Sequence, residues 1–240
     1  MTWAVVMGAS SPIGATCALK LAEDGHDIVV HYLHHELRAI EVAKAVEELG
    51  RNACLVRHRL DRGGDTAAFC DEVRAAVTKV DALLVASAAG VMRPIDALSE
   101  HHLNWTMQTS AIPLVIATKV LRPRAVVAIS SLGANRVVTN YAAVGIAKAA
   151  LESAVRYLAV ELAPSSRINA VSAGLVRTGA ALRLGSYAEL EETTLRGTPM
   201  GRLVKEADIA ELVSFLLGPK AGMITGAIIP IDGGHSLRWQ

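Results

Sequence analysis

A tyrosine and a lysine stand seven positions apart in the stretch YAAVGIAKAAL, at Tyr141 and Lys148. A phenol holds its proton at neutral pH and releases it when a nearby cation stabilises the phenolate. In a helix, a spacing of seven keeps both side chains on one face and separates them by roughly 10 Å along the axis, against roughly 6 Å for a spacing of four. The pair therefore suggests a proton donor and a cation that act together, although two ordinary residues on a helix flank would show the same spacing.

The distance between the two groups bears on which bond is reduced. When a carbonyl is reduced, hydride goes to the carbon and the proton goes to the oxygen bonded directly to it. When an α,β-unsaturated thioester is reduced, hydride goes to Cβ and negative charge collects on the more distant thioester oxygen. If Lys148 holds the cofactor ribose, the longer spacing moves the phenol towards that oxygen and favours enoyl reduction over ketone reduction.

Glycines and hydroxyl groups occur where a nucleotide-binding loop belongs. The stretch MGASSPIG (7–14) follows an expected strand and opens an expected helix. Gly8 permits the turn, Gly14 permits close approach of helix and strand, and the helix N-terminus offers N–H groups to a pyrophosphate. Ser10 and Ser11 add hydroxyl donors. A turn that binds no ligand is the alternative interpretation.

The second expected strand ends in HYLHH (31–35), without an acid. An acid at this place would bind the ribose hydroxyls of NAD, so its absence favours a 2′-phosphate. His34, His35 and Arg38 supply the cations, although histidine is only partly charged at neutral pH. The motif therefore favours NADPH as the cofactor and leaves NADH open. A metal site is a weaker interpretation, because the stretch lacks a cysteine or carboxylate at ligand spacing.

Short Val/Ile/Ala runs alternate with longer helical patterns along the chain. Strands are expected at 3–7, 28–32, 53–57, 82–86, 125–130, 167–172 and 226–231, and helices at 13–24, 35–49, 65–78, 99–121, 141–162 and 205–217. Strands that are apolar throughout imply a sheet covered on both faces, and alternation with helices implies parallel strands. The sequence predicts an α/β fold with one domain over 1–240: a doubly wound (Rossmann) parallel sheet of about seven strands, with its ligand beyond the carboxyl ends of the strands.

Composition narrows the class of protein. The 240 residues include 24 basic and 23 acidic side chains, for a net charge of +1, so we expect no broad surface for nucleic acid or membrane. No apolar stretch reaches the ~20 residues of a membrane span, and the N-terminus does not resemble a signal peptide. Cys17, Cys54 and Cys70 form no CxxC pair and are expected to be reduced, without a metal. These features predict a cytoplasmic protein.

These motifs together resemble those of a short-chain dehydrogenase/reductase over essentially the full length of the chain. The resemblance rests on GASSPIG, ISS, the Tyr/Lys pair, INAVSAGLVRT (168–178) and ITGAIIPIDGG (224–234). Most members of that superfamily separate the tyrosine and lysine by three residues, whereas the enoyl-thioester reductases separate them by six, as here. GVMRP, NWTM and the run from ISSLGANRVV to YLAVELAP more narrowly resemble the NADPH-using enoyl-acyl-carrier-protein reductase of the third bacterial type.

The resemblance implies roles for particular residues. Tyr141 would give its proton to the enolate, Lys148 would hold the cofactor ribose and Ser131 would lie near the substrate carbonyl. The other cofactor-binding residues that it implies are Gly8, Ser10, Ser11, Ile13, Gly14, His34, Leu60, Ser87, Ala88, Ala89, Ile129, Ala173, Gly174, Val176 and Thr178. It also implies a homo-oligomer, either a dimer or a tetramer.

Several positions depart from the family pattern around the cofactor. Pro12 replaces the middle glycine of the loop, and Ser11 replaces an arginine common in NADPH users. Arg59 stands where an acid beside the adenine is usual, and ASAAG (86–90) replaces Asn-Asn-Ala-Gly. Ser110 replaces the asparagine of the proton relay. These changes permit altered cofactor affinity or a specialised substrate.

Residues 179–203 form a long connection, which we expect to be a lid over the substrate. Its apolar side chains could line an acyl channel, with plain packing or a subunit contact as the alternative: Leu182, Leu184, Tyr187, Leu190 and Leu195. The sequence thus predicts NADPH-dependent reduction of a 2-enoyl thioester, carried by acyl carrier protein or CoA, in fatty-acid or specialised acyl metabolism. A ketoreductase or alcohol dehydrogenase acting on a specialised metabolite, and a non-catalytic nucleotide-sensing protein, are the alternatives.

Overall fold

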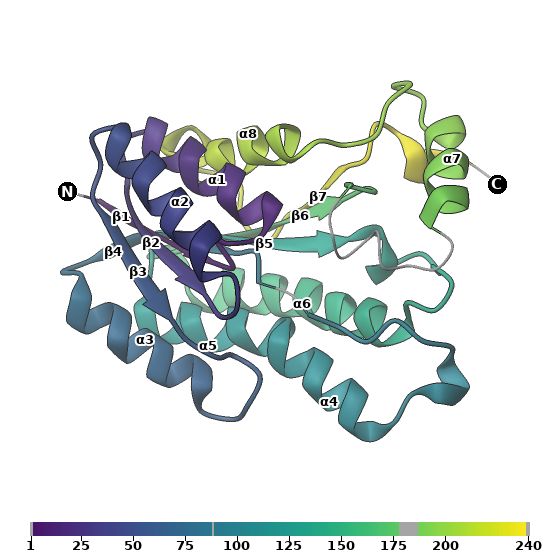
Figure 1. The fold of residues 1–240 in the computed structure, drawn as a ribbon, viewed down its shortest axis with the longest axis horizontal. Coiled ribbons are helices and arrows are strands. Elements are labelled where there is room, and N and C mark those ends of the chain that lie inside the picture. Colours follow the sequence, from purple (N-terminus) through teal and green to yellow (C-terminus); the bar gives the residue numbers. More distant parts are fainter. Residues whose placement is uncertain (1, 88, 178–186, 239–240) are drawn as a thin grey trace.

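A parallel sheet forms the centre of the molecule (Figure 1). The computed structural model describes residues 2–87, 89–177 and 187–238. Within these residues seven strands pair in the order β3-β2-β1-β4-β5-β6-β7. In chain order they are β1 (Trp3–Met7), β2 (Asp27–Tyr32), β3 (Ala53–Arg57), β4 (Val80–Val85), β5 (Ala125–Ser131), β6 (Arg167–Ala173) and β7 (Ile228–Ile231). The order reverses at β1, which lies between β2 and β4, so a ligand is expected beyond the carboxyl ends of the strands near this point.

Helices cover both faces of the sheet (Figure 1). One face is covered by α1 (Pro12–Glu23), α2 (Glu36–Glu48) and α8 (Glu206–Leu217). The other is covered by α3 (Asp65–Ala76), α5 (Ala111–Leu121) and α6 (Ala142–Glu161), with α4 (Glu100–Thr109) beside α5 and α6. α7 (Tyr187–Gly197) lies beyond the end to which β5 and β6 point.

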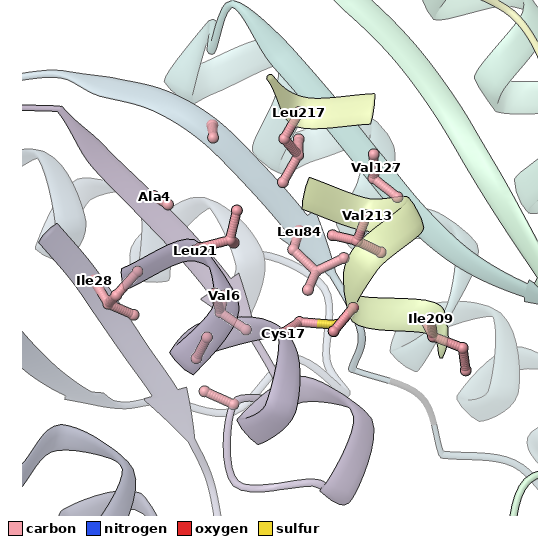
Figure 2. Packing of buried hydrophobic residues seen from close by; sticks show 14 of the residues in the cluster. Ala4, Val6, Cys17, Leu21, Ile28, Leu84, Val127, Ile209, Val213 and Leu217 are labelled. Atoms are coloured by element: carbon pink, nitrogen blue, oxygen red, sulfur yellow. The ribbon is translucent and has the colours of Figure 1, made fainter. Parts of the chain in front are cut away.

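The apolar core fixes the first strand between these two layers. Val6 packs with Leu21 of α1 and Val213 of α8 on one face, together with Leu84 of β4 (Figure 2). Val5, the preceding residue, belongs to the cluster on the opposite face. Because successive side chains of a strand point to opposite faces, a strand buried on both sides must be apolar throughout. This packing holds β1 and α1, and therefore the loop between them, in place.

The predicted fold class is confirmed, and the strands lie where the sequence places them, with small shifts at their ends. The single helix expected over 99–121 is wrong. Two helices, α4 and α5, meet at Ser110, whose φ and ψ are −126° and −75°. Pro113 explains the break, because it has no N–H for the carbonyl of Thr109 and its ring would clash there, whereas proline is tolerated in the first turn of a new helix. Among the described residues, no helix is long and apolar enough to cross a membrane.

Candidate active site

A cavity of ≈ 990 Å³ opens at the carboxyl ends of the strands. The loops that follow β1 to β6 all contribute to its wall, as the strand order leads one to expect. Fifteen of the residues predicted from the sequence line this one cavity: Gly8, Ser10, Ser11, Ile13, His34, Leu60, Ser87, Ala89, Ile129, Ser131, Tyr141, Lys148, Ala173, Gly174 and Val176. Gly14 lies against the backbone of Gly8. Ala88 and Thr178 lie outside the described residues.

Tyr141 and Ser131 place two neighbouring hydroxyl groups on the cavity wall. Tyr141 is the residue just before α6, and its hydroxyl donates to Ser131 Oγ at 3.4 Å. Ser131, the last residue of β5, also accepts from the N–H of Gly133 at 3.3 Å. A Cβ on Gly133 would lie 2.5 Å from the tyrosine ring, so this loop can pass over the ring only as glycine. Burial raises the pKa of Tyr141, and its hydrogen bond with Ser131 lowers the pKa by a smaller amount. The phenol therefore keeps its proton at neutral pH and can act as an acid.

Lys148 lies on the same helix, about two turns further along. Its side chain is only 5% exposed, and Nζ donates to the carbonyl of Ile129 at 2.7 Å. An ammonium group has three N–H donors, so two remain for a ligand in the cavity. Burial lowers the pKa of Lys148 to about 8, while the charge of Glu152 acts in the opposite direction. The group is therefore a buried cation whose charge is sensitive to its surroundings.

The loop after β1 has the geometry of an anion-binding turn. Gly8 has a φ of +84°, and a Cβ on Gly14 would lie 2.2 Å from the Gly8 carbonyl oxygen. Ser11 caps α1: its Oγ accepts from the N–H of Gly14 at 3.1 Å and donates to the Gly8 carbonyl at 2.8 Å. Pro12 has no N–H, and among the described residues the N–H of Ile13 has no acceptor. The Ile13 amide is thus left free for an anion at the positive end of the helix.

Ser87 lies directly against this loop, since a Cβ on Gly8 would be 2.8 Å from the Cα of Ser87. Its Oγ is buried and has no hydrogen-bond partner among the described residues. A buried hydroxyl without a partner is costly, so the site is suited to a polar ligand. The free amide, the glycine turn and this hydroxyl together fit the pyrophosphate and ribose of a nicotinamide dinucleotide. Gly8, Ile13 and Ser87 would contact these groups, and Lys148 would contact the ribose next to the nicotinamide.

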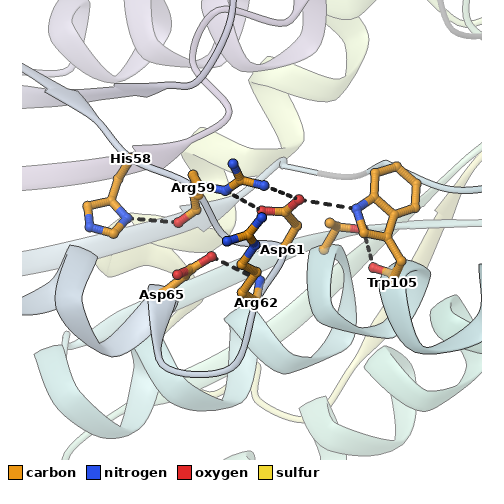
Figure 3. A network of polar contacts seen from close by, with 7 residues as sticks. His58, Arg59, Asp61, Arg62, Asp65 and Trp105 are labelled. Atoms are coloured by element: carbon orange, nitrogen blue, oxygen red, sulfur yellow. Dashed lines mark hydrogen bonds and ion pairs between the residues drawn. The ribbon is translucent and has the colours of Figure 1, made fainter. Parts of the chain in front are cut away.

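A charged network borders the cavity beside α4 (Figure 3). Arg59 donates to both carboxylate oxygens of Asp61, each at 2.9 Å. Trp105 of α4 donates from Nε1 to Asp61 Oδ2 at 3.3 Å. The Arg59 guanidinium lowers the pKa of Asp61, which lines the cavity with Trp105. The arginine that replaces the family's acid is therefore engaged with a carboxylate two residues later, and the network ties the loop after β3 to α4.

The sequence did not identify His31 as part of the site. This residue is 3% exposed within β2 and lies against the ring of Phe69, with the ring centroids 4.8 Å apart. Its Nδ1 accepts from the N–H of Gly8 at 2.9 Å, and its Nε2 bonds to the carbonyl of His58 at 3.1 Å. Burial lowers the pKa of His31 to about 4. A histidine inside an otherwise apolar strand was the available signal, but the cluster HYLHH drew attention to His34 and His35 instead.

The expected lid is described only in part. Leu182 and Leu184 lie outside the described residues. In α7, Leu190 and Thr194 line the cavity, whereas Leu195 is 42% exposed. Arg177 pairs with Glu191 at 3.2 Å and so links the chain after β6 to α7. Ser110, at the position of the family's relay asparagine, is buried at the break between α4 and α5 rather than on the cavity wall.

Comparison with known proteins identifies the family. Residues 8–236 match the family model described as Enoyl-(Acyl carrier protein) reductase. The chain is 34% identical over 244 residues to a 1-cyclohexenylcarbonyl-CoA reductase of Streptomyces collinus, with 97% of this chain and 86% of the relative covered. It is 31% identical over 245 residues to a 3-oxoacyl-[acyl-carrier-protein] reductase of Aggregatibacter actinomycetemcomitans, with 96% and 97% covered.

A solved structure gives the same result for the fold. A short-chain dehydrogenase/reductase of Serratia marcescens superposes with a TM-score of 0.90 at 26% identity, and 98% of each chain is covered. The family match extends over nearly the whole chain and includes the glycine loop, Tyr141 and Lys148. The chain is therefore an oxidoreductase of the short-chain dehydrogenase/reductase superfamily, whose fold binds a nicotinamide dinucleotide, and belongs to the family described as enoyl-(acyl carrier protein) reductase.

Proposed function

We propose that this chain reduces the carbon–carbon double bond of a 2-enoyl thioester, with NADPH as the reductant. The observation that carries the proposal is the placement of Tyr141 immediately before α6, with Lys148 about two turns further along the same helix. A cation that holds the ribose would then leave the phenol displaced towards the far end of a conjugated acyl group. The names of the family and of the Streptomyces relative support a conjugated thioester as the substrate.

In the proposed mechanism each polar side chain has one task. Bound NADPH supplies the hydride that adds to Cβ. Tyr141 gives its proton to the thioester oxygen as charge develops there, and Ser131 donates a second hydrogen bond to that oxygen. The resulting enol becomes the saturated thioester when Cα takes a proton from water and the oxygen returns its proton to Tyr141. Lys148 holds the ribose with the two N–H donors that Ile129 leaves free.

Cations beside the adenosine end support NADPH over NADH. His34, His35 and Arg38 line the cavity beyond the carboxyl end of β2. The strand ends in Tyr32, not in an acid that would repel a 2′-phosphate. An arginine binds phosphate through charge-assisted hydrogen bonds.

One assay separates the proposal from its alternatives. Purified protein is given NADPH or NADH with crotonyl-CoA, 1-cyclohexenylcarbonyl-CoA or acetoacetyl-CoA, and oxidation of the cofactor is followed. We expect turnover of the enoyl thioesters with NADPH. Turnover of acetoacetyl-CoA alone would contradict the proposal and support a ketoreductase, the activity named for the Aggregatibacter relative. Cofactor binding without turnover of any thioester would support a nucleotide-sensing protein.

The substrate end of the site is proposed to include α7. Leu190 and Thr194 line the cavity, so we infer that the segment 179–203 covers the acyl group. The preference for CoA or for acyl carrier protein as the carrier is tested by supplying the same crotonyl group on each. A Leu190→Ser variant should raise KM for the longer acyl chains more than for crotonyl-CoA. An equal change for all chain lengths would remove Leu190 from the acyl site.

We also propose that the chain assembles as a homo-oligomer. Three apolar side chains on α6 are more than half exposed in the single chain, and such a group favours burial against another copy: Ile146, Tyr157 and Val160. Light scattering in solution gives the mass directly. A monomer at micromolar concentration would contradict this expectation.

A further inference from the structure

Glu152 is a buried carboxyl group on the helix that carries Tyr141 and Lys148. It lies one turn beyond Lys148, is 8% exposed and does not line the cavity. Its Oε1 accepts from the hydroxyl of Ser130 at 2.6 Å. Acidic side chains are seldom buried to this extent, because a carboxylate loses its hydration there. No step of the proposed mechanism uses Glu152, so its burial on this helix needs another reason.

Two consecutive residues of β5 hold two side chains of α6. The Ile129 carbonyl accepts from Lys148 Nζ at 2.7 Å, and the Ser130 hydroxyl donates to Glu152 at 2.6 Å. Lys148 and Glu152 are four residues apart, so they share one face of the helix. These two hydrogen bonds fix the rotation of α6 about its own axis and its position along β5. Apolar contacts alone would leave both less well defined, since they are not directional.

Glu152 also acts on the charge of Lys148. Burial favours the neutral amine and lowers the pKa of Lys148 to about 8, whereas the negative charge of Glu152 raises it. Charges buried in protein attract one another more strongly than charges in water, and salt screens them less. The hydrogen bond from Ser130 keeps the Glu152 carboxylate in place. Ser130 therefore influences the charge of Lys148 only indirectly, through Glu152.

We propose that Glu152, held by Ser130, is a positioning residue that keeps Lys148 charged and fixed against β5, ready to bind the cofactor. The inference rests on the proposed function, because Lys148 needs its charge only in a protein that binds a nicotinamide dinucleotide.

Other charged groups near α6 do not offer the same effect. β5 and the turn Leu132–Ala134 contain no ionisable side chain. Tyr141 is the other titratable group of the site on this side, and its pKa is raised by burial. The ionisable residues on the remaining elements packed against α6 make no contribution to the pKa of Lys148: Arg167 on β6, Lys119 on α5, and Glu100, His101 and His102 on α4.

The test compares two substitutions that remove one negative charge from α6. Glu152→Gln keeps the shape of the side chain and an acceptor for Ser130, whereas Glu161→Gln removes an exposed carboxylate near the end of the same helix. Binding of NADPH, and of NADH in parallel, is measured by fluorescence from about pH 6.5 to about pH 9.5, without a thioester. The readout is the pH at which affinity falls as Lys148 loses its proton.

We expect Glu152→Gln to move this midpoint down by about one pH unit, which is about tenfold weaker binding on the alkaline side, with affinity near the wild-type value at the acidic end. Glu161→Gln should leave the midpoint unchanged. A midpoint for Glu152→Gln within about 0.2 unit of the wild type would overturn the inference, as would equal shifts in both variants.

A second variant covers the case in which Glu152→Gln does not fold. The pair Ser130→Ala and Glu152→Leu removes both polar partners at once, so no buried group is left without a hydrogen bond. Its midpoint should fall by at least as much as for Glu152→Gln, and an unchanged midpoint contradicts the inference.

A wild-type chain that binds the cofactor but reduces no enoyl thioester contradicts the proposed function alone. A chain that binds neither NADPH nor NADH defeats both.

Discussion

The backbone N–H of Gly8 donates to Nδ1 of His31 at 2.9 Å, and both residues line the cavity. The same ring bonds through Nε2 to the carbonyl of His58 at 3.1 Å. Both bonds form only if the imidazole is neutral, with its proton on Nε2. One buried ring thus joins the loop after β1 to the loop after β3, and the loops that flank the dinucleotide site depend on its protonation state.

Replacing this ring should weaken cofactor binding through the loop. In His31→Phe, the Gly8 amide loses its acceptor, which should cost about 1–3 kcal/mol of unfolding free energy. We expect affinity for NADPH to fall about tenfold because the glycine turn is no longer held. Chemical denaturation and calorimetric titration measure the two effects. His101→Phe, at an exposed position on α4, is the control and should change neither quantity. Unchanged binding by His31→Phe would show that the turn holds its shape without the ring.

The free energy of unfolding should decrease as the pH falls through the weakly acidic range. The pKa of His31 is about 4 in the folded chain, against 6.5 without perturbation, so the unfolded chain takes up the proton first. The stabilisation that comes from keeping His31 neutral in the folded chain is complete above about pH 6.5. It is lost progressively down to pH 4, by about 3 kcal/mol of unfolding free energy in total. Three carboxyl groups have pKa values lowered from an ordinary value of 3.8: Asp61, Asp208 and Asp232. They therefore change the unfolding free energy mainly below about pH 4. Urea denaturation between these pH values should show a slope that His31→Phe removes, and an equal slope in both proteins would rule His31 out.

His31 also illustrates what the sequence could and could not predict. The apolar runs 3–7, 82–86 and 125–130 predict buried strands because a parallel sheet excludes water from both faces. From the sequence, a polar residue within such a run could belong either to the core or to the functional site. Only the fold shows that His31 meets the Gly8 amide, because the loop that carries Gly8 is 23 residues away in sequence.

Contacts between loops account for most of what the sequence left undetermined. The family resemblance placed Arg59 beside the adenine. In the structure its guanidinium donates to Asp61, and Trp105 donates to the same carboxylate from α4. The hydroxyl of Ser11 is directed to the Gly8 carbonyl, so its proton already has an acceptor within the loop. By contrast, Tyr141 and Lys148 were predictable together, because helix geometry fixes their separation from the sequence.

Gly14→Ala should disrupt the nucleotide loop. The added Cβ would lie 2.2 Å from the Gly8 carbonyl oxygen, which is backbone and cannot rotate away. Overpacking of this kind typically costs about 1–3 kcal/mol, and displacement of α1 should abolish tight binding of NADPH. Thermal unfolding and cofactor titration test both effects. Gly63→Ala is the matched control, since no atom lies within 4 Å of its added Cβ. A Gly14→Ala protein with normal melting and binding would contradict this account of the loop.

Arg38→Ala should change the preference between the two cofactors. Arg38 lines the cavity near the adenosine end, where only NADPH carries a 2′-phosphate. Loss of one charge-assisted contact should weaken NADPH about tenfold and leave NADH within about twofold. Titrations with both cofactors give the ratio. Lys44→Ala, an exposed cation on the same helix that does not line the cavity, controls for the change in net charge. Equal weakening of both cofactors would remove Arg38 from phosphate recognition.

Tyr141→Phe should abolish proton donation while the cavity keeps its shape. The ring still packs against Gly133, but the hydroxyl that reaches Ser131 is gone. General acid catalysis typically contributes about 10²–10⁴-fold, so we expect kcat for crotonyl-CoA to fall by at least about a hundredfold. Affinity for NADPH should change less than about threefold, because the ribose contact belongs to Lys148. Tyr157→Phe on the same helix, where the tyrosine is 69% exposed, should behave as wild type. Burial raises the pKa of Tyr141, so the wild-type phenol is protonated at neutral pH. Any loss of rate between pH 7 and pH 9 should therefore reflect deprotonation of Lys148, whose pKa is about 8. Near-normal turnover by Tyr141→Phe would assign the acid to another group, with Ser131 the nearest candidate hydroxyl.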